Sequence, residues 1–471
     1  MIRLPSVHRE QAMRIPVFAD SISGNVRRQD DTTLKNRREI IAGISAYCGT
    51  GLVAPALLTS KARASQKVLR IMRWKNFVPA YEAWFNDEFV TQWSRENDTE
   101  VVVSNVGLGE IGRLAAEEVK AGEGHDLVLF LSPRPSLEDH TIDHKEIHLE
   151  CERRFGKAYE FVRRSVFNPR TGRYHGFAES YAPTVVTYRS DIWNAVGTVP
   201  DNWDGIRKAG RAAKLLHEAP VGLSLASEHN ADHSLRALLA AFGSFVQNED
   251  RRPALNSKNT LEALKFGKAL YEETMSPEVL NWTSASNNQA MLSGAASLTI
   301  DTMSVVRAAE AKSLPVEPDL ALAKLPVGPA GRGGPAFATN TYVIWRFARN
   351  IKGAQKFLLD YIGSFRDGLT RSGFQNMPAF PGAVPDLNEL IRAPSKASGR
   401  YDVLSEVPDT LTNLGFPGHS NAATDEVLNR RIIPEMFSRV AKGSATPQEA
   451  MDLAGAAIAP IFDKWRETGK I

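Results

Sequence analysis

The sequence is poor in cysteine, in long apolar runs and in excess charge of either sign. Of its two cysteines, only Cys151 lies beyond residue 64, so the remainder of the chain has no internal disulfide. Residues 1–64 hold ten of the 57 basic and five of the 54 acidic residues, which leaves 47 basic and 49 acidic residues. This balance excludes the basic surface typical of nucleic-acid-binding proteins. Beyond residue 64, no apolar run approaches membrane-spanning length.

Short catalytic motifs are also absent. The chain has no G-x-S-x-G nucleophile elbow, no H-E-x-x-H zinc motif and no Walker A loop. The sequence therefore indicates no catalytic residue, and the absence of these motifs does not by itself favour a binding role. The expectation of a protein that is not an enzyme, with no cofactor and no bound metal, rests on the resemblance described below.

The N-terminal 64 residues are typical of an export signal. Arg37 and Arg38 precede a modestly apolar stretch at 40–58, which is followed by the small-residue pattern Ala62-Arg63-Ala64. The arginine pair resembles a twin-arginine signal. We expect cleavage after Ala64 and a mature protein in the bacterial periplasm.

The first part of the mature chain alternates strands and helices. Apolar runs at 67–74, 99–106 and 125–132 predict strands, and the aromatic spacing of 78–97 and the pattern of 112–121 predict helices. This β-α-β-α-β order is typical of a parallel sheet covered by helices. A chain of about 400 residues exceeds a single core, so we expect two lobes.

The remaining patterns continue the α/β character. A strand is predicted within 181–193, and a helix over 199–216 with Asp201 as its cap. Asn287 and Asn288 open a helix-to-strand segment, and we expect them to be capping or turn residues. The tail at 424–467 is mainly helical.

The order of several short motifs resembles the family 1 extracellular solute-binding proteins, the periplasmic receptors of ABC importers. The motif residues are Tyr188 and Asp191 at a strand end, Pro200, Trp203 and Asp204 at a helix start, the segment from Gly294 to Asp301, and the turn from Leu325 to Pro329. The resemblance spans nearly all of 66–467. It implies an α/β, two-lobed periplasmic binding protein fold of type II, with the ligand cleft between the lobes and a hinge of several segments.

The resemblance also implies an organisation and partners. We expect the signal at 1–64, the first lobe at 65–183 and 326–408, and the second lobe at 184–325 and 409–471. Chain crossings are expected near 182–186, 322–334 and 405–414. The implied partners are a small-molecule ligand and the permease subunits of an ABC transporter, with the receptor itself a monomer.

Ligand-binding residues are expected in loops at the carboxyl ends of strands, where open α/β sheets hold ligands. The candidates are Trp74, Ser132, Pro133, Glu179, Tyr181, Asp232, Asp301, Asn340, Asn376 and Asn421. Amide and carboxylate groups suit a hydroxyl-rich solute, such as a carbohydrate, a polyol or a sugar acid. The stretches DTMSVV and GHSNAATD lack the aromatic residue that sugar-binding members often have there, and three carboxylates also suit a polyamine.

Two other patterns leave alternatives open. Gly107, Gly109 and Gly112 spell the G-x-G-x-x-G of a dinucleotide site, so an exported NAD(P)-dependent oxidoreductase is the second hypothesis. The glycines follow the second strand rather than the first, and the next strand ends without the ribose-binding acid, which favours an ordinary strand-to-helix loop. His140, His144 and His148 have helical spacing, as metal ligands can, which leaves a metal-binding receptor, or a zinc hydrolase, as a further alternative. We expect a polar, solvated patch without metal.

Overall fold

The computed structural model describes residues 67–228, 230–331, 333–335, 339–393 and 399–471. The predicted export signal at 1–64 lies outside these residues. Within them, every helix is too short or too polar to cross a bilayer.

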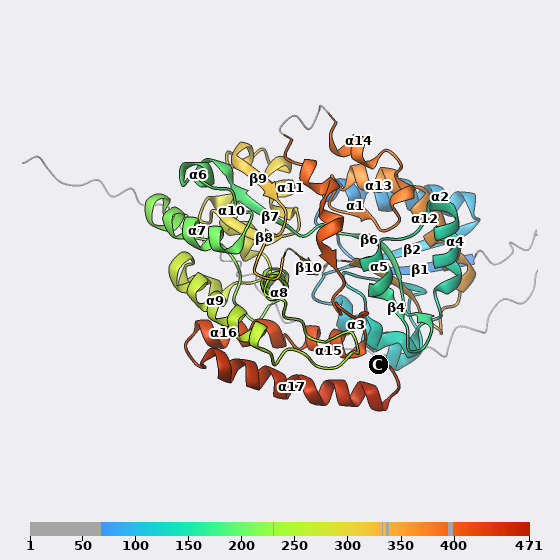
Figure 1. The fold of residues 1–471 in the computed structure, drawn as a ribbon. Coiled ribbons are helices and arrows are strands. Elements are labelled where there is room, and N and C mark those ends of the chain that lie inside the picture. The colour runs from blue at the N-terminus through green and yellow to red at the C-terminus, as the bar shows by residue number, and fades with distance from the viewer. Residues whose placement is uncertain (1–66, 229, 332, 336–338, 394–398) are drawn as a thin grey trace, which may run out of the picture. The chain divides into compact units, whose positions relative to one another are not determined.

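A six-stranded mixed sheet forms the centre of the first lobe, in the order β12-β6-β11-β3-β1-β2. Three of its strands, β1, β2 and β6, are labelled in Figure 1. The pairs β1–β2 and β1–β3 are parallel, as the sequence predicts, and β11 runs antiparallel to both β3 and β6. The strands are β1 Lys67–Trp74, β2 Thr99–Val106, β3 Leu127–Phe130, β6 Phe177–Tyr181, β11 Thr339–Ile344 and β12 Met377–Pro378.

Helices cover both faces of this sheet because its central strands are apolar on both sides. Met72 and Val128 pack against α3 Ile111–Ala121, whereas Leu129 belongs to the core on the opposite face. The predicted helix over 78–97 is confirmed as a run of α1 Pro79–Ala83, the π-helix η1 Trp84–Phe89 and α2 Val90–Glu96. The other elements of this lobe are η2 Pro135–His140, α4 Lys145–Phe155, α5 Glu160–Val166, β4 Phe167–Asn168, β5 Arg173–Tyr174, α12 Ile351–Gly363, α13 Phe365–Arg371, η5 Pro381–Ala383, α14 Leu387–Ile391, η7 Asp402–Ser405 and η8 Val407–Thr410.

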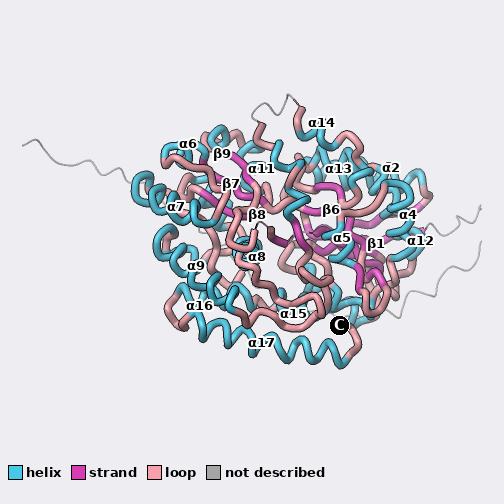
Figure 2. Tube along the Cα trace, viewed as in Figure 1, coloured by secondary structure: helices cyan, strands magenta, loops and turns pink. Residues whose placement is uncertain are grey.

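A three-stranded antiparallel sheet, β8-β7-β9, forms the centre of the second lobe. Its strands are β7 Val185–Arg189, β8 Leu298–Asp301 and β9 Leu320–Ala323, and Figure 2 shows helices around both sheets. The helices of this lobe are α6 Ser190–Ala195, α7 Trp203–His217, α8 Ala231–Ala241, α9 Lys258–Thr274, η3 Pro277–Asn281, α10 Ser286–Ser293, α11 Ser304–Ala311, η4 Glu317–Asp319, α15 Ala422–Asn429, α16 Ile432–Ala441 and α17 Pro447–Glu467.

The cap of α7 differs from the prediction. Asn202, not Asp201, occupies the N-cap position, and its side-chain oxygen accepts a hydrogen bond of 2.7 Å from the Gly205 N–H. The sequence offers both residues side by side, and the cap falls on the one directly before the first helical turn.

The chain passes between the two sheets at two of the segments where crossings are predicted, and the third crossing, near 405–414, stays a prediction. Residues 182–184 join β6 to β7, β10 Gly334–Pro335 lies between β9 and β11, and β13 Leu411–Thr412 precedes α15. The two short strands β10 and β13 pair in parallel, with α8 packed beside β10 (Figure 1). Strand β10, at the second crossing, is therefore hydrogen-bonded to β13, while the exact lobe boundaries stay a prediction.

Candidate functional site

Asp301 is the centre of a buried polar cluster at the end of β8. Its carboxylate accepts hydrogen bonds from the side-chain amides of Asn287, at 2.7 Å, and Asn230, at 3.3 Å, and from the Thr302 N–H, at 2.6 Å. The cluster forms here because the chain leaves the sheet after Asp301, next to Val185 at the start of β7. The expectation that Asn287 is a cap or turn residue is wrong, since its side chain reaches across to Asp301 instead.

The start of α8 brings a histidine to the same cluster. His233 Nε2 lies 3.9 Å from the Asp301 carboxylate, and the ring is buried. Burial lowers the pKa of His233, and the nearby carboxylates of Asp301 and Asp232 oppose that shift. A neutral imidazole offers one donor and one acceptor, so His233 adds two-way hydrogen-bonding capacity beside Asp301.

The cluster is joined directly to the first lobe. Gln375 Nε2 donates to Thr302 Oγ1 at 3.0 Å, and its Oε1 is buried with no hydrogen-bond partner among the described residues. The predicted residue Asn376 follows Gln375, is buried, and has its N–H bonded to Ser372 Oγ at 3.2 Å. The structure therefore brings the Asp301 and Asn376 regions together, through their neighbours Thr302 and Gln375.

Asn340 and Glu179 lie on neighbouring strands but on opposite faces of the sheet. Asn340 Nδ2 donates to Ser180 Oγ at 2.9 Å, which places Asn340 on the face of Ser180, and side chains alternate along β6. Burial raises the pKa of Glu179 to about 7, against the opposing effects of the Ser180 and Tyr361 side chains and of Arg73. Glu179 therefore belongs to the polar interior of the first lobe rather than to a group with Asn340.

The other first-lobe candidates end strands or fill the core. Trp74 ends β1, is 3% exposed and packs beside Phe77 with ring centroids 5.5 Å apart. Ser132 and Pro133 are buried directly after β3, the strand next to β1. Tyr181 packs edge-on against aromatic rings of the α5 region, so it is a core residue.

Asp232 and Asn421 have structural partners. Asp232 accepts from Arg236 Nε at 2.8 Å, and its other oxygen lies 3.7 Å from Arg431 Nη1. Asn421 caps α15 by accepting from two backbone N–H groups, and its amide donates to Gln247 Oε1 at 2.6 Å. Both residues are buried, and the Asn421 amide is used within the protein, whereas Asp232 Oδ2 has an ion pair with Arg431 but no hydrogen-bond partner among the described residues.

A second contact between the lobes involves charge. Arg134, after β3, has Nε 3.2 Å from Oδ1 of Asp425 on α15, and Ser136 donates to the same carboxylate. Asp425 is buried, and sequence reasoning missed this pair because nothing in either local motif connects residues 291 positions apart.

The histidines are not a solvated patch, so that expectation is wrong. His140 is exposed, but His144 and His148 are fully buried, because α4 turns this face toward the core. His144 bonds the Tyr174 carbonyl through Nδ1 and accepts from the Ile344 N–H through Nε2, both at 3.0 Å, so neither nitrogen is free to bind a metal. Among the described residues, no three His, Cys, Asp or Glu side chains gather as metal ligands would.

The loop that contains Gly107, Gly109 and Gly112 is an ordinary strand-to-helix connection. It joins β2 to α3 as predicted, and β2 is the edge strand of the sheet. None of its three glycines has a positive φ, and a Cβ would meet nothing within 4 Å at Gly109. The Gly107 N–H donates to the carboxylate of the exposed Glu110 at 3.3 Å, so the loop bonds to a surface side chain of its own helix start.

Comparison with known proteins decides the family. The model of the bacterial extracellular solute-binding protein family matches residues 76–362, more than half of the chain. The chain belongs to this family. No curated protein sequence matches it.

Solved structures of solute-binding proteins share the fold of the chain. An ABC transporter solute-binding protein from Thermotoga lettingae, bound with α-D-tagatose, is 17% identical, with a TM-score of 0.70 over 84% of this chain and 100% of that one. One from Agrobacterium radiobacter, in complex with ribitol, is 15% identical, with a TM-score of 0.66 over 84% and 98%. A sugar transporter from Arthrobacter chlorophenolicus, with laminaribiose, is 14% identical, with a TM-score of 0.70 over 83% and 99%. The predicted family and the two-lobed type II fold are thereby confirmed.

Several polar residues at the junction of the lobes were missed in the sequence. Asn230 and His233 flank the predicted Asp232, and Thr302 and Gln375 flank the predicted Asp301 and Asn376. The positions of the loops were predictable, but which side chain of each loop faces the junction depends on helix phase and strand register.

Proposed function

We propose that the chain is a periplasmic receptor that captures a small hydroxyl-rich solute by hinge closure and delivers it to an ABC transporter permease. The observation that carries the proposal is the cluster of the buried Asn287 and Asp301 with the half-buried Asn230, which Thr302 joins to Gln375 of the first lobe. At a junction of two lobes, amide and imidazole groups both donate and accept and a carboxylate accepts, which suits the hydroxyls of a sugar or polyol. The sugar and polyol ligands of the similar structures support the same class.

The charge distribution favours a neutral solute over a polyamine. Of the three predicted carboxylates, Glu179 lies inside the first lobe, and Asp232 is neutralised by Arg236 and Arg431. Only Asp301 is left to meet a cation, and the binding of a polyamine needs several separated carboxylates. The oxidoreductase alternative is disfavoured by the match to the solute-binding family.

The proposal separates the predicted site residues into those that contact the solute or border the cleft and those that support the fold. Asp301, Asn340 and Asn376 contact solute, with Trp74, Ser132 and Pro133 at the edge of the cleft. Glu179, Tyr181, Asp232 and Asn421 support the fold from behind. Export through the twin-arginine route, with cleavage after Ala64, and a monomeric state complete the proposal.

The direct test is the identity of the molecule that copurifies with the exported protein. Mass spectrometry of the supernatant after denaturation should find a carbohydrate, polyol or sugar acid at one molecule per chain. Recovery of a nicotinamide cofactor or a polyamine at that ratio instead would contradict the proposal.

A further inference from the structure

Phe77 differs in exposure from every other aromatic residue that the structure describes. It is 62% exposed, whereas each other described Phe, Tyr and Trp is buried or half-buried. Single exposed apolar residues are common on protein surfaces. The meaning of this exposure therefore depends on where Phe77 lies in the fold and on what holds it there.

The loop of Phe77 joins β1 to α1 at an edge that the larger sheet shares with the chain crossings. Strands β1 and β3 are parallel and end in register, and β11 begins opposite the end of β3. Tyr181, at the end of β6, pairs both with Thr339 at the start of β11 and with Met377 at the start of β12. The loop after β1 therefore lies at the same edge as the end of β6, where the chain crosses to the second lobe.

The second lobe reaches this edge next to the loop of Phe77. Arg134, four residues after β3, has its Nε 3.2 Å from Oδ1 of Asp425 on α15. Strand β3 is the neighbour of β1 in the sheet, so the loops that follow these two strands are neighbours as well. The exposed ring of Phe77 is therefore carried by a loop at the junction of the lobes.

The loop itself is fixed from below, which leaves Phe77 exposed. The Asn76 N–H donates to Glu82 Oε1 at 2.8 Å, and Asn76 Oδ1 accepts from the Val78 N–H at 2.9 Å. Asn76 is buried, and α1 begins directly after Val78. The buried Trp74 packs beside Phe77, with ring centroids 5.5 Å apart. A ring held in this way loses little conformational freedom when it binds a partner.

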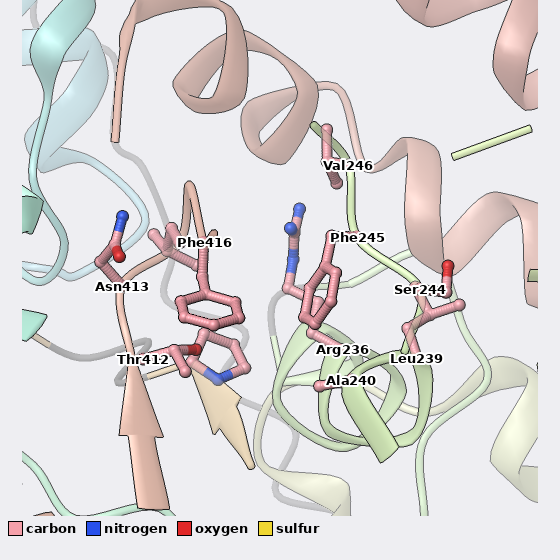
Figure 3. Close-up of a pocket in the computed structure, with 11 residues that line it drawn as sticks. Arg236, Leu239, Ala240, Ser244, Phe245, Val246, Thr412, Asn413 and Phe416 are labelled. Carbon is pink, nitrogen blue, oxygen red and sulfur yellow. The ribbon is translucent and has the colours of Figure 1, made fainter. Parts of the chain in front are cut away.

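The second lobe offers no comparable ring among the described residues. Its segments 224–234 and 301–306, which surround Asp301, contain no Phe, Tyr or Trp. Phe245 and Phe416 are half-buried, pack edge-on with ring centroids 5.1 Å apart, and form walls of the pocket in Figure 3. That cavity measures about 30 Å³, which is room for one or two water-sized groups and too small for a sugar ring.

The Asp301 cluster meets the same edge of the larger sheet, but farther along it. Asp301 pairs with Val185 just after β6, and its neighbour Thr302 bonds Gln375 just before β12. These strands are three and four places from β1 in the sheet order, which is roughly 14–19 Å at the usual spacing between strands. A single sugar ring is too small to contact both the Asp301 cluster and Phe77.

We propose that Phe77 is the stacking platform for a terminal ring of a carbohydrate with two or more rings, whose other end reaches the Asp301 cluster. The apolar C–H face of the terminal ring covers the Phe77 ring, which otherwise borders water. This assignment rests on the proposed function and narrows the solute from hydroxyl-rich molecules in general to an oligosaccharide.

The test compares trisaccharides with the monosaccharides from which they are built. Isothermal titration calorimetry of the exported chain measures the Kd of D-glucose against maltotriose, cellotriose and laminaritriose, and of D-mannose against mannotriose. Wild-type protein should bind at least one trisaccharide tenfold or more tightly than its monosaccharide. Phe77→Ala, which removes the ring, should bring that ratio below threefold while the Kd of the monosaccharide stays unchanged.

Control variants separate stacking from a general loss of apolar surface. Leu216→Ala removes a side chain that is 74% exposed at the end of α7 in the second lobe, and should keep the wild-type ratio. Phe77→Trp keeps an aromatic face and should keep the ratio within threefold. Circular dichroism checks that each variant is folded.

The Phe77→Trp variant also reports where the solute binds. All eight native tryptophans are buried or half-buried, so iodide quenching of fluorescence acts mainly on the new residue. A saturating amount of the trisaccharide that binds should lower the quenching constant of the variant at least twofold. Unchanged quenching in the saturated variant would show that the solute does not cover this position.

Other outcomes would also overturn the assignment. A wild-type ratio near one in every series, or an unchanged ratio in folded Phe77→Ala protein, would exclude the platform and leave the proposed function intact. Unchanged affinity with a loss of solute uptake by cells that carry Phe77→Ala would mean that Phe77 contacts the transporter instead. If no carbohydrate or polyol binds at all, the proposed function fails, and the assignment fails with it.

Discussion

At the scale of single residues, the structure separates side chains that hold the fold from side chains available to a solute. Glu179, in the middle of β6, and Asp301, at the end of β8, are both buried acids, and the sequence treats them alike. Asp301 is surrounded by amides at the junction of the lobes, whereas Glu179 lies among tyrosines and Arg73. Their substitutions should therefore have different effects.

Glu179 should make the protein less stable as the pH rises. Its pKa is raised to about 7 in the folded state by burial, whereas the unfolded chain loses the proton near pH 4.5. Between these values only the folded state holds the proton, so stability falls as the pH rises through this window. Glu179→Gln should remove the loss and gain up to about 3 kcal/mol at pH 8, with no gain at pH 4. Urea unfolding at both pH values measures the difference, and an equal effect at both would refute it.

Asp301→Asn should weaken solute binding at least tenfold while the protein stays folded. The substitution keeps the shape but removes the charge that the Asn230 and Asn287 amides and the Thr302 N–H share. Charge-assisted hydrogen bonds are about twice as strong as neutral ones, so we also expect a loss of about 1–2 kcal/mol in stability. Titration calorimetry with the copurified solute measures the binding. Wild-type affinity in the variant would remove Asp301 from the site.

At the scale of elements, the sequence predicted most helices and strands but not their surroundings. β1 and β2 have the predicted bounds, because each is an apolar run between polar turns. The burial of His144 and His148 was not predictable from their spacing, because α4 is polar on average and its buried face appears only when Tyr174 and Phe380 pack on it. In the same way, Asn421 is a residue type that often binds ligands from a loop, but in the structure it caps α15.

The α4 histidines should destabilise the protein in acid. Burial lowers the pKa of His148 to about 3 and that of His144 to about 4, against 6.5 in the unfolded chain. The unfolded state therefore binds more protons below pH 6.5, and each histidine costs about 2 kcal/mol by pH 5. His148→Phe places a ring that suits the aromatic surroundings of this position, and it should reduce the loss of stability between pH 6.5 and pH 5. His140→Gln, at an exposed position, should leave it unchanged, and an equal response of both variants would contradict the account.

The cap of α15 distinguishes a structural role of Asn421 from a binding role. Asn421→Ala removes the acceptor of two N–H groups and should cost about 1 kcal/mol, whereas Asn421→Asp keeps it and should cost less. Thermal unfolding measures both. Because we place Asn421 behind the site, solute affinity in Asn421→Asp should stay within threefold of wild type. A tenfold loss in that folded variant would return Asn421 to the contact residues.

At the scale of the whole molecule, the chain links the two sheets and side chains of the two lobes contact each other directly. The order of the motifs was enough to predict the family and the fold. The pairs Thr302–Gln375 and Arg134–Asp425 were not predictable, because each joins residues far apart in sequence that only the folded chain brings together. Ligand binding at this junction should couple directly to stability.

The measurement that tests the central claim most directly is thermal melting of the exported chain with and without candidate solutes. A ligand that binds only the folded state stabilises it by about 2.7 kcal/mol at a hundred times its Kd. We predict that at least one carbohydrate, polyol or sugar acid raises the Tm, and that Asp301→Asn abolishes the shift. A Tm raised by NAD(P)H or by a polyamine, and by none of the hydroxyl-rich solutes, would contradict the account.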